Sequence, residues 1–127
     1  MKYLLDTHAF LWYFEASNRT SKTAKSIIRD TNARKYVSVA SLWEFSVKYS
    51  SGKLQFEGGL AYLWKMITDN GFTILPISQS HLAETIHLPF HHRDPFDRLL
   101  IATALAENMT VLTADENIKQ YDVPSVW

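Results

Sequence analysis

The stretch Asp94–Thr113, with the sequence DPFDRLLIATALAENMTVLT, gives the clearest indication of the fold. Its Asp-Pro opening is typical of the start of a helix, because aspartate caps free amides there and proline needs no amide partner. An apolar run continues the helix to Glu107, and Asn108 is a residue type that often ends helices. Thr110–Thr113 then predicts a strand directly after the helix, because its residues are β-branched or apolar.

The same alternation of short strands and longer helices runs through the rest of the chain. Apolar or β-branched runs predict further strands at Tyr3–Leu5, Tyr36–Val39, Thr73–Leu75 and, more briefly, around Val123. Helical patterns lie between them at His8–Glu15, Ser21–Thr31, Ser41–Ser50, Leu60–Asn70 and Ser78–Ile86. Such alternation indicates β-α-β units. We therefore expect an α/β fold in three layers, with a mainly parallel central sheet of four to five strands and helices on both of its faces.

Length and composition favour a single domain over residues 1–127. Hydrophobic residues make up 46% of the chain, which is enough to build a core. The 13 basic and 13 acidic side chains give a formal net charge of zero, which argues against binding to nucleic acid through a broad basic surface. There is no cysteine, so disulfides, thiolate zinc sites and cysteine nucleophiles are excluded.

The sequence favours a cytoplasmic protein without a membrane segment. We expect no signal peptide, because Asp6 and His8 interrupt the apolar N-terminal run and no small-residue cleavage site follows. The longest apolar stretches, Ala9–Phe14 and Leu99–Ala106, are too short to span a bilayer. The lack of cysteine suits a reducing compartment.

Four carboxylates stand where an open parallel sheet binds ligands, beyond the carboxyl ends of its strands. Asp6 directly follows the first predicted strand, and Asp115 lies two residues beyond the fourth. Glu44 lies one turn into the helix after the second strand, and Asp97 lies in the first turn of the helix that leads into the fourth. We therefore expect these four side chains to meet at one edge of the sheet.

Such a cluster of carboxylates favours a bound divalent cation. Two like charges about 4 Å apart repel by roughly 4 kcal/mol at an effective dielectric constant near 20. A cation offsets this repulsion, and an all-oxygen donor set without cysteine favours a hard ion, Mg²⁺ or Mn²⁺. Such an ion binds phosphate and can activate a water molecule for attack on phosphorus.

Each acidic residue also has a purely structural interpretation. Asp6 and Asp115 stand where they could cap the elements that follow their strands, and Asp94 is well placed to cap the helix that begins at Pro95. Asp97 would interact favourably with the dipole of that helix. Glu44, between two aromatic residues, lies either on a solvated helix face or in a buried position with a function. The functional interpretation therefore rests on the placement of several acids at one edge of the sheet and not on any single residue.

The histidines and arginines near these acids are less informative. A zinc site of His and Asp is an alternative, but the spacing of His8, His81, His87, His91 and His92 matches no zinc signature. His91, His92 and Arg93 are expected to form a polar loop near the acids. Arg93 and Arg98 could contact phosphate or form local ion pairs, and we favour ion pairs.

Aromatic residues are numerous for a chain of this size. The 17 aromatic side chains concentrate around Phe10–Phe14, Trp43–Tyr49 and Tyr62–Trp64. Most are expected in the core. A surplus on the surface could form a groove for a partner helix or a dimer face.

Four segments of the chain carry a resemblance to a known family. They are YLLDTHAFLW at 3–12, SVASLWEFSVK at 38–48, HHRDPFDRLLIATAL at 91–105 and TVLTADENI at 110–118. Their order and spacing resemble those of a PIN domain and, more narrowly, of the VapC-type toxins of bacterial toxin–antitoxin pairs. The resemblance covers nearly the whole chain, and only 55–79 contains no specific match.

The resemblance implies a site and an activity. It matches Asp6, Glu44, Asp97 and Asp115 to the four family acids, and it makes Asp94 an additional, secondary acid. It also implies Mg²⁺- or Mn²⁺-dependent endonucleolytic cleavage of RNA. The partners it implies are a cognate antitoxin, which lays a helix in an aromatic groove and blocks the acidic site, and a second copy of the chain in a homodimer.

Two other functions remain open from the sequence. Asp6 could form an aspartyl phosphate in a phosphotransferase or phosphatase, but the usual second aspartate two residues later is His8 here. A binding module that holds RNA or metal without cleaving is the non-enzymatic alternative. A cleavage assay separates both from the nuclease.

Overall fold

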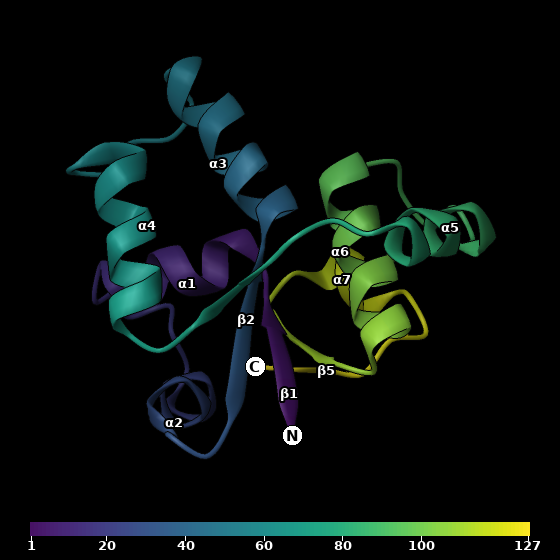
Figure 1. The fold of residues 1–127 in the computed structure, drawn as a ribbon, viewed down its shortest axis with the longest axis horizontal. Coiled ribbons are helices and arrows are strands. Elements are labelled where there is room, and N and C mark those ends of the chain that lie inside the picture. Colours follow the sequence, from purple (N-terminus) through teal and green to yellow (C-terminus); the bar gives the residue numbers. More distant parts are fainter.

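A sheet of five parallel strands forms the middle of the computed structural model, which describes residues 1–127 (Figure 1). Its strands are β1 (Lys2–Leu5), β2 (Arg34–Ser38), β3 (Thr73–Leu75), β4 (Thr110–Leu112) and β5 (Ser125–Val126). They lie in the order β3-β2-β1-β4-β5, and every neighbouring pair is parallel. The expected α/β fold with a parallel sheet is thereby confirmed, and the short strand near the C-terminus is the fifth.

Seven helices connect and cover the strands. They are α1 (Thr7–Phe14), α2 (Lys22–Arg29), α3 (Val39–Ser50), α4 (Gly59–Asp69), α5 (Gln79–His87), α6 (Pro95–Glu107) and α7 (Glu116–Lys119). The short α7 was not predicted from the sequence. The boundary between β2 and α3 also differs, because the Ser38 side chain accepts a hydrogen bond from the Ala40 amide and ends the strand before Val39. None of the helices is long and apolar enough to cross a lipid bilayer.

Each face of the sheet has its own hydrophobic core. Figure 1 shows α1, α2 and α4 on one side of the strands, and α5, α6 and α7 on the other. Leu5 and Val37 point into the first core, while Leu4 and Val111 point into the second. This division follows from the strand geometry, in which successive side chains face opposite sides of a sheet. Each fully buried leucine or valine contributes about 1.5–3 kcal/mol.

The parallel arrangement brings the carboxyl ends of β1, β2 and β4 to one edge. The amide of Asp6, the first residue after β1, donates a hydrogen bond of 3.2 Å to the carbonyl of Leu112 at the end of β4. The strands β1 and β4 therefore end side by side at this edge of the sheet. The helices α1, α3 and α7 begin at this edge, so their first turns surround the same space.

Candidate active site

A small cavity of about 80 Å³ lies at this edge and is lined only by polar and charged residues. All four acids predicted from the sequence line it, together with Asp94. The complete lining consists of Asp6, Thr7, His8, Glu44, Lys48, Asp94, Asp97 and Asp115. Residues from opposite ends of the chain therefore converge in one place.

Asp6 is the most deeply buried acid of the cavity, with 6% of its surface exposed. It caps α1, because its Oδ1 accepts a hydrogen bond of 2.7 Å from the Ala9 amide. Its Oδ2 accepts a second hydrogen bond from the Thr113 hydroxyl. Burial raises the pKa of Asp6 to about 6; the bonds from Thr113 and Ala9 lower it, and the charges of Asp115 and Glu44 raise it. A carboxylate that is this hard to ionise is typical of functional sites.

Asp97 lies in the first turn of α6 and is held from one side. Its Oδ2 is 3.0 Å from Nε2 of His92, while its Oδ1 makes no hydrogen bond. Burial raises the pKa of Asp97 to about 6, the His92 bond lowers it, and the charges of Asp94, Asp115 and Glu44 raise it. Asp94 caps α6 through bonds from the Phe96 and Asp97 amides and also lines the cavity, so its capping role is observed.

Glu44 is buried, with 7% of its surface exposed, which decides between the two interpretations of its position. Its Oε1 accepts a hydrogen bond of 2.5 Å from the Thr7 hydroxyl, and its Oε2 lies 2.7 Å from Nζ of Lys48. Burial alone lowers the pKa of Lys48, but the hydrogen bond and charge of Glu44, together with the charges of Asp94 and Asp97, outweigh it and leave this pKa above its usual value. Lys48 is therefore a fixed positive charge at the cavity.

Asp115 completes the group from the end of β4. Its Oδ1 accepts a hydrogen bond of 2.9 Å from the Asn117 amide and so caps α7. Its own amide donates a hydrogen bond of 3.0 Å to the hydroxyl oxygen of Thr113. Thr113 thus links Asp6 to the backbone of Asp115. Neither Thr113 nor Thr7 was identified from the sequence, although both directly adjoin a predicted acid or strand end.

The donor chemistry of the cavity fits a hard divalent cation. Five carboxylates and one lysine line it, and no sulfur is present. One oxygen each of Asp94, Asp97 and Asp115 is free of hydrogen bonds, whereas both oxygens of Asp6 and Glu44 are engaged. No group of three or more Asp, Glu and His side chains is arranged to hold a metal ion as it stands. Carboxylate oxygens are the ligands that Mg²⁺ and Mn²⁺ prefer.

The expected ion pairs of Arg93 and Arg98 are not formed. Neither guanidinium lies within 4.0 Å of a carboxylate oxygen. Arg93 lies over the ring of Phe90, and Arg98 is buried and donates to backbone carbonyls and to the Tyr121 hydroxyl. The prediction of ion pairs was wrong for Arg98 because the carbonyls at the end of α5 satisfy its guanidinium.

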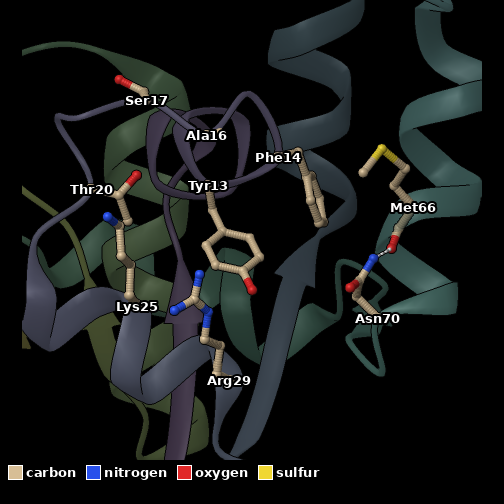
Figure 2. A pocket seen from close by; sticks show the side chains of 9 residues that line it. All are labelled: Tyr13, Phe14, Ala16, Ser17, Thr20, Lys25, Arg29, Met66 and Asn70. Carbon is tan, nitrogen blue, oxygen red and sulfur yellow. Dashed lines mark hydrogen bonds between the residues drawn. The ribbon is translucent and has the colours of Figure 1, made fainter.

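A second, larger cavity of about 280 Å³ shares no residue with the acidic one (Figure 2). It lies between the end of α1, the turn that follows, α2 and the end of α4. Its lining combines aromatic rings with two cations and contains no acid: Tyr13, Phe14, Ala16, Ser17, Thr20, Lys25, Arg29, Met66 and Asn70. The carboxylates of the site are therefore confined to the smaller cavity.

The aromatic residues are divided between core and surface. Phe10 and Phe45 are fully buried. Trp43, Tyr62 and Trp64 remain 43–61% exposed on α3 and α4. These exposed rings form the surplus expected from the sequence.

Comparison with known families gives one match over nearly the whole chain. The sequence profile of the PIN domain matches residues 3–124. No curated protein sequence matches the chain.

Solved structures with the same fold include two VapBC structures and a toxin–antitoxin complex. VapBC2 from Rickettsia felis, bound to a DNA fragment from its promoter, has a TM-score of 0.76 at 17% identity over 100% of this chain and 99% of that one. VapBC-1 from nontypeable Haemophilus influenzae has a TM-score of 0.73 at 17% identity over 99% and 97%. A toxin-antitoxin complex from Klebsiella pneumoniae has a TM-score of 0.66 at 17% identity over 98% and 95%. At these identities the likeness concerns the fold.

Proposed function

The chain belongs to the PIN domain family, and from this premise we propose that it is a metal-dependent endoribonuclease, the toxin of a toxin–antitoxin pair. One observation carries the proposal. Asp6, Glu44, Asp97 and Asp115, which the sequence scatters over 110 positions, line one small cavity without a single hydrophobic neighbour. Nuclease chemistry with a divalent cation requires such a convergence of carboxylates. Its nucleophile is a water molecule, so no side chain has to act as one.

The acids of the cavity would hold Mg²⁺ or Mn²⁺, directly or through water. When bound, such an ion neutralises negative charge on a phosphodiester and activates a water molecule for attack on phosphorus. Asp97 and Asp115 each offer an oxygen that makes no hydrogen bond, and Asp6 is held rigidly by Ala9 and Thr113. With pKa values of about 6, Asp6 and Asp97 are mainly ionised at neutral pH.

Glu44 and Lys48 have complementary tasks in this proposal. Thr7 and Lys48 fix the two oxygens of Glu44 at the cavity, so Glu44 can orient a water molecule or accept its proton. Lys48 has a raised pKa and remains charged at neutral pH, so it can attract a phosphate oxygen of the substrate. Removal of Lys48 should therefore weaken RNA binding more than metal binding.

The aspartyl-phosphate alternative fits the geometry poorly. Both oxygens of Asp6 accept hydrogen bonds, and only 6% of the residue is exposed. Each oxygen keeps a lone pair beside its hydrogen bond, but attack on phosphorus also needs an oxygen that the substrate can reach, and Asp6 is nearly completely buried. Mass spectrometry after incubation with a phosphoryl donor would detect a phosphoaspartate and so revive this alternative.

The partners follow the same proposal. The similar structure from K. pneumoniae is a toxin–antitoxin complex, which supports a cognate antitoxin for this chain. We assign the exposed rings of Trp43, Tyr62 and Trp64 to protein contacts, either with that antitoxin or between two copies in a homodimer. We place the toxin in the cytoplasm, where its RNA substrate is found. Size-exclusion chromatography with and without a co-expressed antitoxin tests both contacts.

The decisive experiment is cleavage of pooled cellular RNA by the purified protein with Mg²⁺, Mn²⁺ or EDTA. We expect cleavage with either metal, no cleavage with EDTA, and a loss of at least a hundredfold in Asp97→Asn, a range typical for a lost group in the transition state. Asp69→Asn is the matched control, because Asp69 is exposed on α4 and pairs only with Lys65. A folded protein that binds Mn²⁺ but cleaves no RNA would favour the non-cleaving binding module.

A further inference from the structure

A continuous line of hydrogen bonds connects a buried arginine to Asp97. Nη1 of Arg98 donates to the Tyr121 hydroxyl at 3.0 Å, and this hydroxyl lies 2.9 Å from Nδ1 of His92. Nε2 of the same imidazole lies 3.0 Å from Oδ2 of Asp97. Arg98 and Tyr121 are 8% and 4% exposed, and the His92 and Asp97 side chains are 15% and 17% exposed. The line is therefore largely shielded from solvent.

The arginine at the start of this line cannot easily move. Nη1 of Arg98 also donates to the Pro89 carbonyl at 2.7 Å, and Nη2 lies 3.4 Å from the carbonyls of Thr85 and Leu88. The ring of Phe90 lies 3.9 Å from the guanidinium carbon, which adds a cation–π contact. Arg98 thus joins the end of α5 and the loop before His92 to the first turn of α6, and it fixes the Tyr121 oxygen as an acceptor.

The donors and acceptors along the line determine where the protons lie. The Tyr121 oxygen accepts from Arg98, so its single proton is free to point at His92, where Nδ1 at 2.9 Å is a nearer acceptor than the carbonyl at 3.3 Å. A neutral imidazole that accepts at Nδ1 carries its proton on Nε2. That proton points at Oδ2 of Asp97, which as a carboxylate can only accept. The hydrogen bonds on the Arg98 side and on the Asp97 side of His92 therefore both place its proton on Nε2.

We propose that His92 and Tyr121 are positioning residues for Asp97, with Arg98 as their anchor. His92 holds Oδ2 of Asp97 in the Nε2–H tautomer that Tyr121 imposes, and it leaves Oδ1 as the oxygen that Asp97 offers to the acidic cavity. This inference rests on the proposed function in one respect, because Oδ1 is to hold the divalent cation there. Neighbours that orient a metal ligand in this way are typically worth 10–100-fold in metal affinity.

The variant Tyr121→Phe tests the proposal with little change in packing. It removes one hydroxyl and keeps the ring, which contacts the rings of His91 and His92 edge to face. Tyr36→Phe is the matched control, because Tyr36 packs against the same hydrophobic core that contains Tyr121 and its hydroxyl makes no hydrogen bond. Thermal melts first establish that both variants fold.

The first measurement is the ¹⁵N NMR spectrum of the imidazoles in EDTA, at a pH well above the ordinary histidine pKa of about 6.5. We expect the Nε2–H tautomer for His92 in the wild type and in Tyr36→Phe. In Tyr121→Phe only Asp97 still favours this tautomer, so we expect a measurably larger share of the Nδ1–H form. A wild-type His92 protonated at Nδ1, or at both nitrogens, would overturn the assignment. A change in packing alone would leave the tautomer as it is.

The second measurement is the affinity for Mn²⁺, by titration calorimetry and without RNA. We expect Tyr121→Phe and His92→Ala to bind Mn²⁺ about 10–100-fold more weakly than the wild type, and Tyr36→Phe to bind it equally well. Unchanged affinity in both site variants would overturn the positioning role even if the wild type cleaves RNA. A wild type that binds Mn²⁺ and loses affinity in Tyr121→Phe, yet cleaves no RNA, would overturn the proposed function and leave this inference intact.

Discussion

Replacement of Asp6 by asparagine should stabilise the folded protein while it disables the site. Asp6 is nearly completely buried, and burial raises its pKa from an ordinary value of 3.8 to about 6. The folded state therefore resists ionisation of this carboxyl. A difference of about two pH units corresponds to about 3 kcal/mol of folding free energy at neutral pH.

The pH dependence of this effect has a definite sign. A raised pKa in the folded state gives stability that is fully present below pH 3.8 and is lost as the pH rises through about 6. Asparagine never ionises, so Asp6→Asn avoids this loss. It also keeps the helix cap, because asparagine and aspartate cap about equally well. The Thr113 hydroxyl, however, must change its partner, so we expect a net gain of about 1–3 kcal/mol at pH 7 and little gain near pH 4.

Thermal unfolding in EDTA, followed by circular dichroism at both pH values, measures this gain. For a chain of this length, about 1–3 kcal/mol corresponds to a rise in Tm of roughly 4–12 °C. The surface variant Asp69→Asn should differ from the wild type by less than about 0.5 kcal/mol at either pH. If Asp6→Asn is less stable than the wild type at pH 7, or if its gain is the same at pH 4, the reasoning from buried charge is refuted.

Three further predictions concern single contacts. Thr113→Val should raise the pKa of Asp6 above about 6, because it removes the Thr113 hydrogen bond that lowers this pKa in the wild type. Titration of the carboxyl carbons by NMR measures the change, and a lower pKa would contradict the reasoning. Ser78→Ala should cost about 1 kcal/mol in urea unfolding, because Ser78 and His81 cap α5 reciprocally; an unchanged midpoint would mean that the cap contributes nothing. Asn108, at φ 56°, ends α6 in the left-handed conformation, so Asn108→Gly should be at least as stable as the wild type and Asn108→Ala should be less stable by about 1 kcal/mol; the opposite order in melts would disprove this.

The sequence predicted most of the fold because its local signals agree with one another. The Asp-Pro start of α6 and the Asn108 that ends it lie where the structure places them. The boundary of β2 was misplaced because Val39 has a strand-forming side chain, whereas the cap by Ser38 decides the conformation. The helix α7 was missed because four residues are too short to show a helical period.

The acids of the candidate site were predictable, but their surroundings were not. Asp6 and Asp115 stand directly beyond strands, and the topology of parallel sheets alone brings such positions together. The partners of these acids are set by contacts between distant segments, such as Thr113 with Asp6 and Tyr121 with His92. No periodicity or spacing encodes these contacts. The same is true of Arg98, whose partners are three backbone carbonyls and the distant Tyr121 hydroxyl, none of which a sequence pattern indicates.

The order of the strands has a consequence for how the protein is made. The first strand of the chain, β1, is the central one, and its neighbour β4 is synthesised about a hundred residues later. The pairing of β1 with β4 therefore cannot form, and Asp6 cannot contact Thr113, until the segment Thr110–Thr113 has left the ribosome. Partial chains that end before Thr110 should lack a cooperative unfolding transition, which circular dichroism of such truncations would test. A nascent chain with this topology therefore lacks the acidic cavity until the segment that carries β4, Thr113 and Asp115 is available to pair with β1.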